Sequence, residues 1–329
     1  MMALSTGQMF LVAAVLFAGV GALAFSSLVQ PVVRWTARWA PDSRHRAMAL
    51  LAVAPWVVML AGLMSATLPS LVGLFWPAFD HCLAHGGHSH MCFVHGSHHS
   101  GDWLPWSALS IVAVWLVHRL SRGVRDLLRA WRTVRELVHS ARYDTKHELW
   151  VVHSQLPLCI SAGLFRPQLI ISGGLLEQLS TAELGVIAAH EQAHARRMDS
   201  FVRLFVRAAT VFFLPRARER VLAILEAAAE QACDEQAAAC TGDRLSVAEV
   251  ILAMERKLCA SPLLVDNALA MGFGSSSLAD RVQGMLEPAR EPGAFKLLAI
   301  ALALAVVALL GSFEQVHHIT ESLLGHFGH

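Results

Sequence analysis

The sequence predicts a mainly α-helical membrane protein, with about four transmembrane helices and one cytoplasmic α+β domain that contains a small sheet. The chain has 329 residues, of which 55% are hydrophobic and only 16% are charged, whereas soluble globular domains carry about 25% charged residues. Apolar runs that could cross a bilayer lie near both ends of the chain. Residues 143–292 combine short apolar runs with helical patterns, and this mixture indicates a single domain.

Residues 1–142 form the predicted membrane region. Its transmembrane helices are expected at about 9–29, 47–76 and 103–120. The first run is uncharged, and the residues before it include no lysine or arginine. It therefore lacks the basic start of a secretory signal and is interpreted as a retained helix. Prolines interrupt the second run, so its helix is expected to kink or end near Pro69 or Pro77.

The third predicted span is short, but three tryptophans suit a membrane interface: Trp103, Trp106 and Trp115. An apolar stripe then continues through an arginine-rich segment, which predicts an amphipathic helix that leaves the membrane. Its arginines are Arg119, Arg122, Arg125, Arg129, Arg132 and Arg135. Because arginine-rich loops beside spans stay in the cytoplasm, the domain that follows is predicted to be cytoplasmic and the loop 80–102 extracytoplasmic.

The final segment, 293–329, contains a last predicted span at about 297–313, which returns the tail to the extracytoplasmic side. The lipid bilayer is therefore an expected partner. The formal net charge is only +1, so no nucleic acid is implied as a direct partner.

Three short strands are predicted at the start of the domain, at 149–152, 158–162 and 168–172. Ser180 or Thr181 is predicted to cap the next long helix, with Glu183 in its first turn. The apolar segment 201–214 is broken by charges, so an interfacial helix is expected there instead of a span. Further helices are expected at 223–239 and 246–258.

The helix that begins near Thr181 contains an H-E-x-x-H motif, His190-Glu191-Gln192-Ala193-His194. Histidines four residues apart lie on one helix face, so both imidazoles can bind the same metal ion. Glu191 is then placed to act on a water beside that metal. The alternative is a surface helix with two solvated histidines. The apolar residues before the motif argue against it, because they predict burial and buried histidines need partners.

A catalytic zinc ion needs three protein ligands and one open position. Glu230 is the best candidate for the third ligand, and Asp234, one turn later, can accept the second ring proton of a ligand histidine. The alternative is a solvated acidic helix face. Cys233 is interpreted as a buried small side chain.

Four stretches, in this order and with spans before and after them, resemble the BlaR/MecR-type antirepressor metallopeptidases and the related HtpX-type membrane peptidases. The stretches are GLFRPQLII (163–171), LSTAEL (179–184), HEQAHARRMD (190–199) and EQACDE (230–235). The resemblance implies a zincin-like domain with one catalytic Zn²⁺ bound by His190, His194 and Glu230. It also implies that Glu191 is the catalytic base, that Asp234 orients a ligand, and that the chain lies in the bacterial inner membrane.

Members of that group that sense β-lactams carry a penicillin-binding domain after the last span, where this chain has only residues 314–329. Sensing of β-lactams is therefore not expected. The substrate backbone is expected to pair with 168–172 as an exposed strand edge. Arg244 and His153 are weak candidates for a second oxyanion donor, and each is more readily explained as a surface or packing residue.

Eleven of the 18 histidines lie in two segments predicted to be extracytoplasmic. The loop holds His81, His85, His88, His90, His95, His98 and His99, and the tail holds His317, His318, His326 and His329. Imidazole binds Zn, Cu and Ni, so the loop is a candidate metal-binding or metal-sensing cap. The alternative is a solvated low-complexity loop with a Cys82–Cys92 disulfide.

The sequence thus favours a membrane-bound zinc endopeptidase that cuts a regulatory protein, such as a transcriptional repressor, in response to an extracytoplasmic signal. One alternative is an HtpX-like protease for the quality control of membrane proteins. Another, of a different class, is a metal-binding membrane sensor whose protease domain is idle. The intact set of His190, Glu191, His194 and Glu230 disfavours this last alternative.

Overall fold

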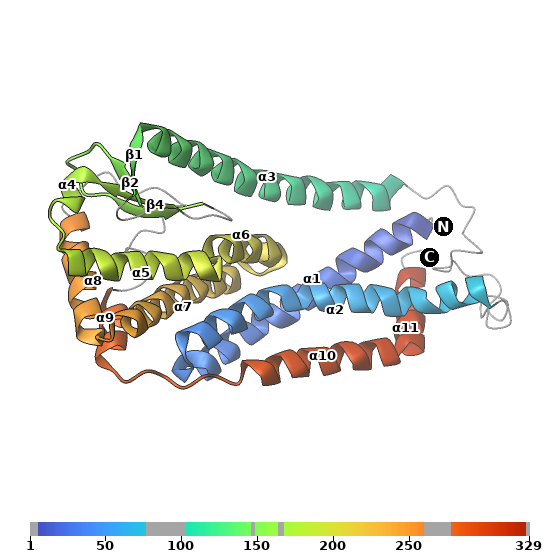
Figure 1. The fold of residues 1–329 in the computed structure, drawn as a ribbon. Coiled ribbons are helices and arrows are strands. Elements are labelled where there is room, and N and C mark those ends of the chain that lie inside the picture. Colours follow the sequence, from blue (N-terminus) through green and yellow to red (C-terminus); the bar gives the residue numbers. More distant parts are fainter. Residues whose placement is uncertain (1–5, 77–102, 146–148, 164–167, 260–277, 327–329) are drawn as a thin grey trace.

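The computed structural model describes residues 6–76, 103–145, 149–163, 168–259 and 278–326. Figure 1 shows an elongated molecule in which several long helices run lengthwise, with a small sheet and its covering helices at one end. Both ends of the chain lie at the opposite end. The mainly helical fold with a small mixed sheet agrees with the prediction from the sequence.

Two helices near the N-terminus are long and apolar enough to cross a membrane, α1 (Thr6–Trp35) and α2 (Pro41–Phe75). A short 3₁₀ turn, η1 (Thr36–Arg38), joins them. Near the other end, α10 (Phe295–Gly311) and α11 (Phe313–His326) meet at 71° and form a third candidate if the pair is one span. The predicted span at 103–120 is not among these helices. The described residues therefore supply two or three candidate spans, where about four were expected.

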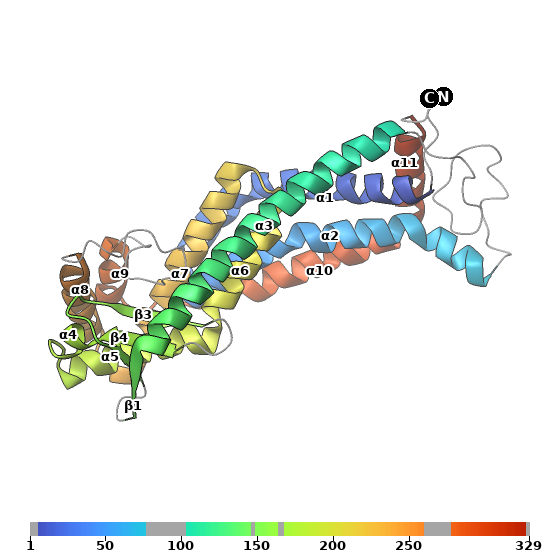
Figure 2. The same ribbon diagram turned by 90° about the horizontal axis from the view of Figure 1, so that it is seen from above.

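The second helix passes through Pro55 and Pro69 and ends at Phe75, directly before Trp76 and Pro77. Figure 2 shows that α2 bends toward its C-terminal end. A proline ring removes one helical hydrogen bond and pushes on the preceding turn, which explains a bend in this part of the helix.

The helices α10 and α11 are held against α2 by two hydrogen bonds. Nδ1 of His317 donates to the carbonyl of Ala66 over 2.6 Å, and the Ser65 hydroxyl donates to the carbonyl of Leu309 over 3.0 Å. His317 is buried, and its Nε2 lies 3.2 Å from Glu321. This histidine therefore joins α11 to α2 through its Nδ1 atom.

The longest helix is α3 (Trp103–Ser140), which has 38 residues and runs directly into the first strand. The predicted third span and the predicted amphipathic helix are thus one continuous element. At 1.5 Å per residue it extends over about 57 Å. Figure 1 shows it leading from the end of the molecule with the two termini to the sheet.

The sheet has four strands, β1 (Ala141–Asp144), β2 (Leu149–Val152), β3 (Cys159–Ala162) and β4 (Gln168–Ser172), in the order β1-β2-β4-β3. The β2–β4 pair is parallel, and the two outer pairs are antiparallel. The expectation that 168–172 forms an exposed edge is wrong, because β4 is hydrogen-bonded to a strand on each side. Its Ile170 and Ile171 are fully buried, as expected of an inner strand. The outer strands are β1 and β3.

Six helices complete the domain: α4 (Gly173–Leu176), α5 (Thr181–Arg197), α6 (Asp199–Ala209), α7 (Pro215–Thr241), α8 (Arg244–Cys259) and α9 (Leu278–Leu286). One core lies between the sheet and the helices α5, α7 and α8, and contains Leu149, Ile171, Ile187, Ala237 and Ile251. Ser180 caps α5 in a reciprocal pair with Glu183, as the sequence predicts.

A second core joins the domain to α1 and α2. It contains Val29 and Met48 from these two helices, together with Val206 from α6 and Leu225 from α7. The segment 201–214 forms most of α6 and the 3₁₀ turn η4 (Thr210–Phe212) and packs into this core. The domain is therefore fixed to the membrane helices by a shared apolar interior.

Candidate metal centre

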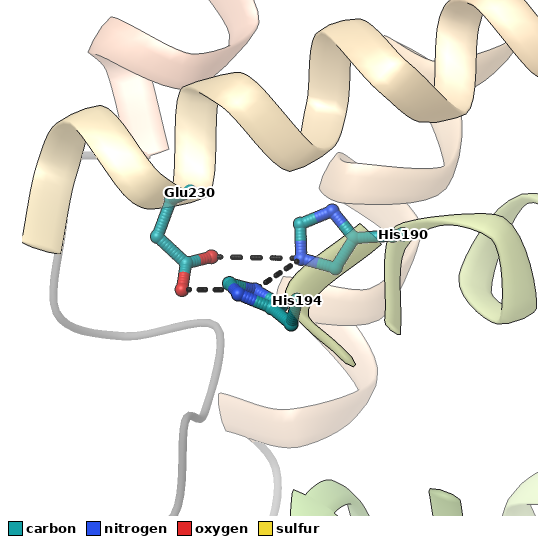
Figure 3. Close-up of side chains that lie close together, drawn as sticks. All are labelled: His190, His194 and Glu230. Atoms are coloured by element: carbon teal, nitrogen blue, oxygen red, sulfur yellow. Dashed lines mark hydrogen bonds and ion pairs between the residues drawn. The ribbon is translucent and has the colours of Figure 1, made fainter. Parts of the chain in front are cut away.

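The histidines of the H-E-x-x-H motif and one carboxylate converge between α5 and α7. Figure 3 shows His190, His194 and Glu230 pointing toward one another. The two Nε2 atoms are 3.2 Å apart. The carboxylate oxygens of Glu230 lie 3.7 Å from Nε2 of His190 and 3.5 Å from Nε2 of His194. All three side chains are buried, and one ligand atom from each lies within 4.8 Å of the others.

The other nitrogen of each imidazole contacts a carboxylate. Nδ1 of His190 lies 3.0 Å from Asp234, and Nδ1 of His194 lies 2.8 Å from Asp199. A carboxylate at Nδ1 favours a proton on that nitrogen and leaves Nε2 with a lone pair. Two lone pairs and a carboxylate then face one another, an arrangement that either a metal ion or a bound proton stabilises.

The spacing also fits a tetrahedral metal. With metal–nitrogen bonds of about 2.0–2.1 Å, two ligand nitrogens should lie about 3.3 Å apart, close to the 3.2 Å found here. The charges agree with this. Glu191, Asp199, Glu230 and Asp234 are buried carboxylates. The guanidinium groups of Arg197 and Arg281 contact members of this set. In formal charges, the acids exceed the guanidinium groups by the charge of one divalent cation.

A sharp turn between two helices brings Asp199 back toward His194. Met198 adopts a left-handed backbone conformation with φ of 55°. It is at once the C-cap of α5 and the N-cap of α6. Asp199 also accepts a hydrogen bond from Nε of Arg197 at 3.2 Å, and Nε2 of His45 in α2 lies 3.7 Å from it. Burial alone would raise the pKa of Asp199, but His194 and Arg197 lower it below its usual value.

Arg281 connects α9 to both carboxylates of α7. It donates two hydrogen bonds to Asp234, at 2.8 and 2.7 Å, and its Nη1 lies 3.1 Å from Glu230. The side chain is 1% exposed. Burial tends to raise the pKa of Asp234, yet the contacts with Arg281 and His190 keep it well below its ordinary value. Asp234 is therefore ionised and able to hold the ring proton of His190.

Glu191 lies beside the two histidines on α5 and is 4% exposed. Its Oε2 is buried and has no hydrogen-bond partner among the described residues. Burial, and next the negative charge of Glu191, raise the pKa of the Cys159 thiol in β3.

Without metal, His194 holds a proton strongly. Burial alone would lower its pKa, but the hydrogen bond with Asp199 and the nearby Cys233 and Glu230 raise it well above its usual value. A metal ion at Nε2 must replace a proton on this ring. Metal affinity at this site should therefore increase with pH.

Two weaker candidates from the sequence do not join the centre. Arg244 pairs with Glu235 at 2.5 and 2.9 Å and donates to the carbonyls of Gly284 and Met285, so it ties α7 to α9. His153 is exposed after β2. The histidines of the loop 80–102 and the predicted Cys82–Cys92 pair lie outside the described residues.

Two residues of the centre were given no role from the sequence, Asp199 and Arg281. Asp199 is only five residues after His194 in the sequence. Its side chain reaches His194 because Met198, between the two helices, has a left-handed backbone conformation. Arg281 lies 47 residues beyond Asp234, and no local pattern connects the two.

Residues 103–284 match a family model described as "BlaR1 peptidase M56". The match covers more than half of the chain and runs from the start of α3 into α9. It includes both histidines, Glu191, Glu230 and the three residues that hold their side chains. No curated protein and no solved structure was found to match the chain.

Proposed function

Because this chain belongs to the BlaR1 peptidase M56 family, which makes it a membrane-associated metallopeptidase, we propose that it is a zinc endopeptidase acting on a regulatory protein. The proposed substrate is a transcriptional repressor or a protein of similar role, cut on the cytoplasmic side of the membrane. The arginine-rich half of α3, which leads into the domain, supports this orientation.

One observation carries the proposal, the convergence of three metal-type donors beside a free carboxylate. His190, His194 and Glu230 supply two imidazoles and one carboxylate, which is a known donor set of catalytic zinc sites. Glu191, one residue after the first ligand, has a buried oxygen without a partner. An unpaired buried carboxylate is costly in a folded protein, so its retention supports a chemical role.

The residues divide the work of peptide hydrolysis among them. A zinc ion in this site supplies Lewis-acid activation of water and of the peptide carbonyl. Glu191 accepts the proton of the attacking water and delivers it to the leaving amine. Asp199 and Asp234 keep the imidazoles in the correct tautomer and orientation, and Arg281 fixes Glu230 and Asp234 relative to each other.

The outer strand β3 is the proposed docking edge for the substrate. Among the described residues it pairs with β4 on one side only, and after burial the negative charge of Glu191 contributes to the raised pKa of Cys159 at its start. An extended peptide that adds to a sheet edge is held by its backbone, with little demand on its side chains. The cleaved bond must therefore lie in a segment that is unfolded or easily extended.

Replacement of the proposed base tests the mechanism. Glu191→Ala should retain one zinc per chain and lose peptide hydrolysis by about 10²- to 10⁴-fold, the usual contribution of general acid–base catalysis. Metal content and cleavage of a peptide library are measured on the full-length protein in detergent. Gln192→Ala, an equal truncation at the exposed neighbouring position, should leave both unchanged. An active Glu191→Ala protein would refute the mechanism.

Proteomics identifies the substrate. Cells with the wild-type chain are compared with cells that carry Glu191→Ala, and the proposed substrate accumulates intact only in the latter. Accumulation of a DNA-binding regulator supports the proposal. Accumulation of many damaged membrane proteins would instead assign the chain to quality control.

A further inference from the structure

A second polar site lies between α3, α6 and α7, apart from the metal centre. It is a cavity of about 520 Å³. Figure 2 shows α3 crossing over α6 and α7 in this part of the molecule. Five arginines line the cavity, Arg119 and Arg122 from α3, Arg203 and Arg207 from α6, and Arg218 from α7. One carboxylate, Asp126, lines it as well.

The positive charge of this cavity is only partly balanced. Glu226 lies 3.0 Å from Arg203 and 3.7 Å from Arg207, so one carboxylate is shared by these two guanidinium groups. Asp126 forms an ion pair with Arg129 at 3.3 Å.

Arg119, Arg122 and Arg218 form no ion pair with another described residue. Arg119 reaches the Val211 carbonyl at 3.4 Å, and Arg218 reaches the Arg207 carbonyl at 3.5 Å, both long hydrogen bonds. The Nε atoms of Arg207 and Arg218 are buried and lack a partner among the described residues. Burial, and then the charges of Arg119 and Arg207, lower the pKa of Arg218. An anion among these guanidinium groups would reduce their mutual repulsion.

The cavity lies where the apolar part of α3 ends. Ile111, Val114 and Val117 on the preceding turns are 65–70% exposed. Trp115 stacks under Arg119, with 5.3 Å from the guanidinium carbon to the ring centre, and contacts Phe212. An exposed apolar face, then an aromatic residue and then arginines is the order expected across the surface of a bilayer.

We propose that this cavity binds the phosphate headgroup of an anionic phospholipid. Guanidinium groups bind phosphate through charge-assisted, often paired hydrogen bonds, and basic pockets between helices at a membrane surface take anionic headgroups. Leu120, Val124, Val211 and Leu222 share the lining with the arginines and offer a surface to the glycerol and the first methylenes of the acyl chains. This apolar lining favours a lipid over free phosphate.

The test compares two double variants of the full-length protein. Arg122→Gln with Arg218→Gln removes one unpaired charge from the α3 wall and one from the α7 wall of the cavity. Arg125→Gln with Arg216→Gln removes the same two charges from exposed positions on the same two helices that do not line the cavity. Each protein is transferred to mixed micelles of phosphatidylglycerol and phosphatidylcholine, and retained lipid is counted by native mass spectrometry.

The wild type and the control variant should retain phosphatidylglycerol in preference to phosphatidylcholine. The cavity variant should bind phosphatidylglycerol at least about tenfold more weakly, as expected for the loss of charge-assisted hydrogen bonds from two guanidinium groups to the phosphate. Equal retention by the two variants, or equal retention of the two lipids by the wild type, would overturn the proposal. Displacement of phosphatidylglycerol by millimolar inorganic phosphate would assign the site to free phosphate and overturn the lipid assignment. Circular dichroism of both variants, with spectra matching the wild type, confirms that a lost lipid reflects the cavity and not unfolding.

Discussion

Asp199 and Asp234 each hold one imidazole of the metal centre through its Nδ1 atom. Replacement of either by asparagine keeps the shape but removes the charge that favours the correct tautomer. We expect Asp199→Asn and Asp234→Asn each to weaken zinc binding by about 10- to 100-fold, the usual effect of losing such a partner. Competition with a chromophoric chelator gives the zinc dissociation constant.

Asp243→Asn is the matched control for these variants, because Asp243 caps the start of α8 and contacts neither histidine. Its zinc affinity should equal that of the wild type. If Asp199→Asn and Asp234→Asn also bound zinc normally, the two carboxylates would have no part in positioning the ligands.

At this scale the sequence predicted the residues whose spacing follows from one helix. His190, Glu191 and His194 are found by the helical repeat. The one-turn spacing of Glu230 and Asp234 also allows a solvated acidic helix face, and the resemblance to the antirepressor peptidases favours the pair. Asp199 reaches His194 only because a methionine adopts a conformation that glycine usually takes. Arg281 arrives from a separate helix. No local sequence pattern predicts the contact of Asp199 with His194 or that of Arg281 with Asp234.

Among the elements, α5 depends on a reciprocal cap at its start. The Ser180 hydroxyl accepts from the Glu183 amide at 3.2 Å, and the Glu183 carboxylate accepts from the Ser180 amide at 2.7 Å. Ser180→Ala should lower the free energy of unfolding by about 1 kcal/mol. Thr181→Ala, which alters the exposed next position, should have a smaller effect. Denaturant titration in mixed micelles measures both, and equal effects would show that the cap contributes nothing.

The same cap predicts a dependence on pH. Hydrogen bonds from the backbone and side chain of Ser180 lower the pKa of Glu183 below its ordinary 4.5. A lowered folded pKa means that this contribution to stability is complete above about pH 4.5 and is lost as the pH falls through the folded pKa. Glu183→Gln should therefore flatten part of the acid limb of the stability profile. A variant with the unchanged acid limb would contradict this assignment.

Two elements differ from the sequence prediction for identifiable reasons. The helix α3 shows no break between its apolar and its arginine-rich half, because the sequence between them has no proline and its one glycine, Gly123, does not interrupt the helix. The strand β4 lies inside the sheet because the chain passes from β2 through β3 before it returns. Strand order depends on contacts between distant residues, and a short apolar run does not reveal it.

For the whole molecule, the predicted orientation can be tested with a natural cysteine. Cys240 is exposed on α7, in the domain that should face the cytoplasm. A membrane-impermeant maleimide should label it in inverted membrane vesicles but not in intact spheroplasts. Mass spectrometry locates the label, and Cys240→Ser is the control for the other cysteines. Labelling of Cys240 from the outside would reverse the topology.

Composition alone predicted a membrane protein with one domain, because charge content and long apolar runs reflect the solvent around each part. The number of transmembrane spans is harder to predict from the sequence. The helices α10 and α11 meet at 71°, an angle that no local pattern reveals, and no stretch of α3 is both long and apolar enough to be a candidate span. The shared core that joins α6 and α7 to α1 and α2 was likewise not visible in the sequence.

The direct junction at Met198 has a consequence for both sites of this protein. The helix α6 begins with Asp199, which contacts His194 of the candidate metal centre, and carries Arg203 and Arg207 into the basic cavity. Only Met198 separates α5 from α6. A shift of α6 would therefore move residues of both the candidate metal centre and the basic cavity. If the two sites are coupled in this way, their effects on each other must be equal. A bound headgroup changes the affinity for metal by the same factor as bound metal changes the affinity for the headgroup.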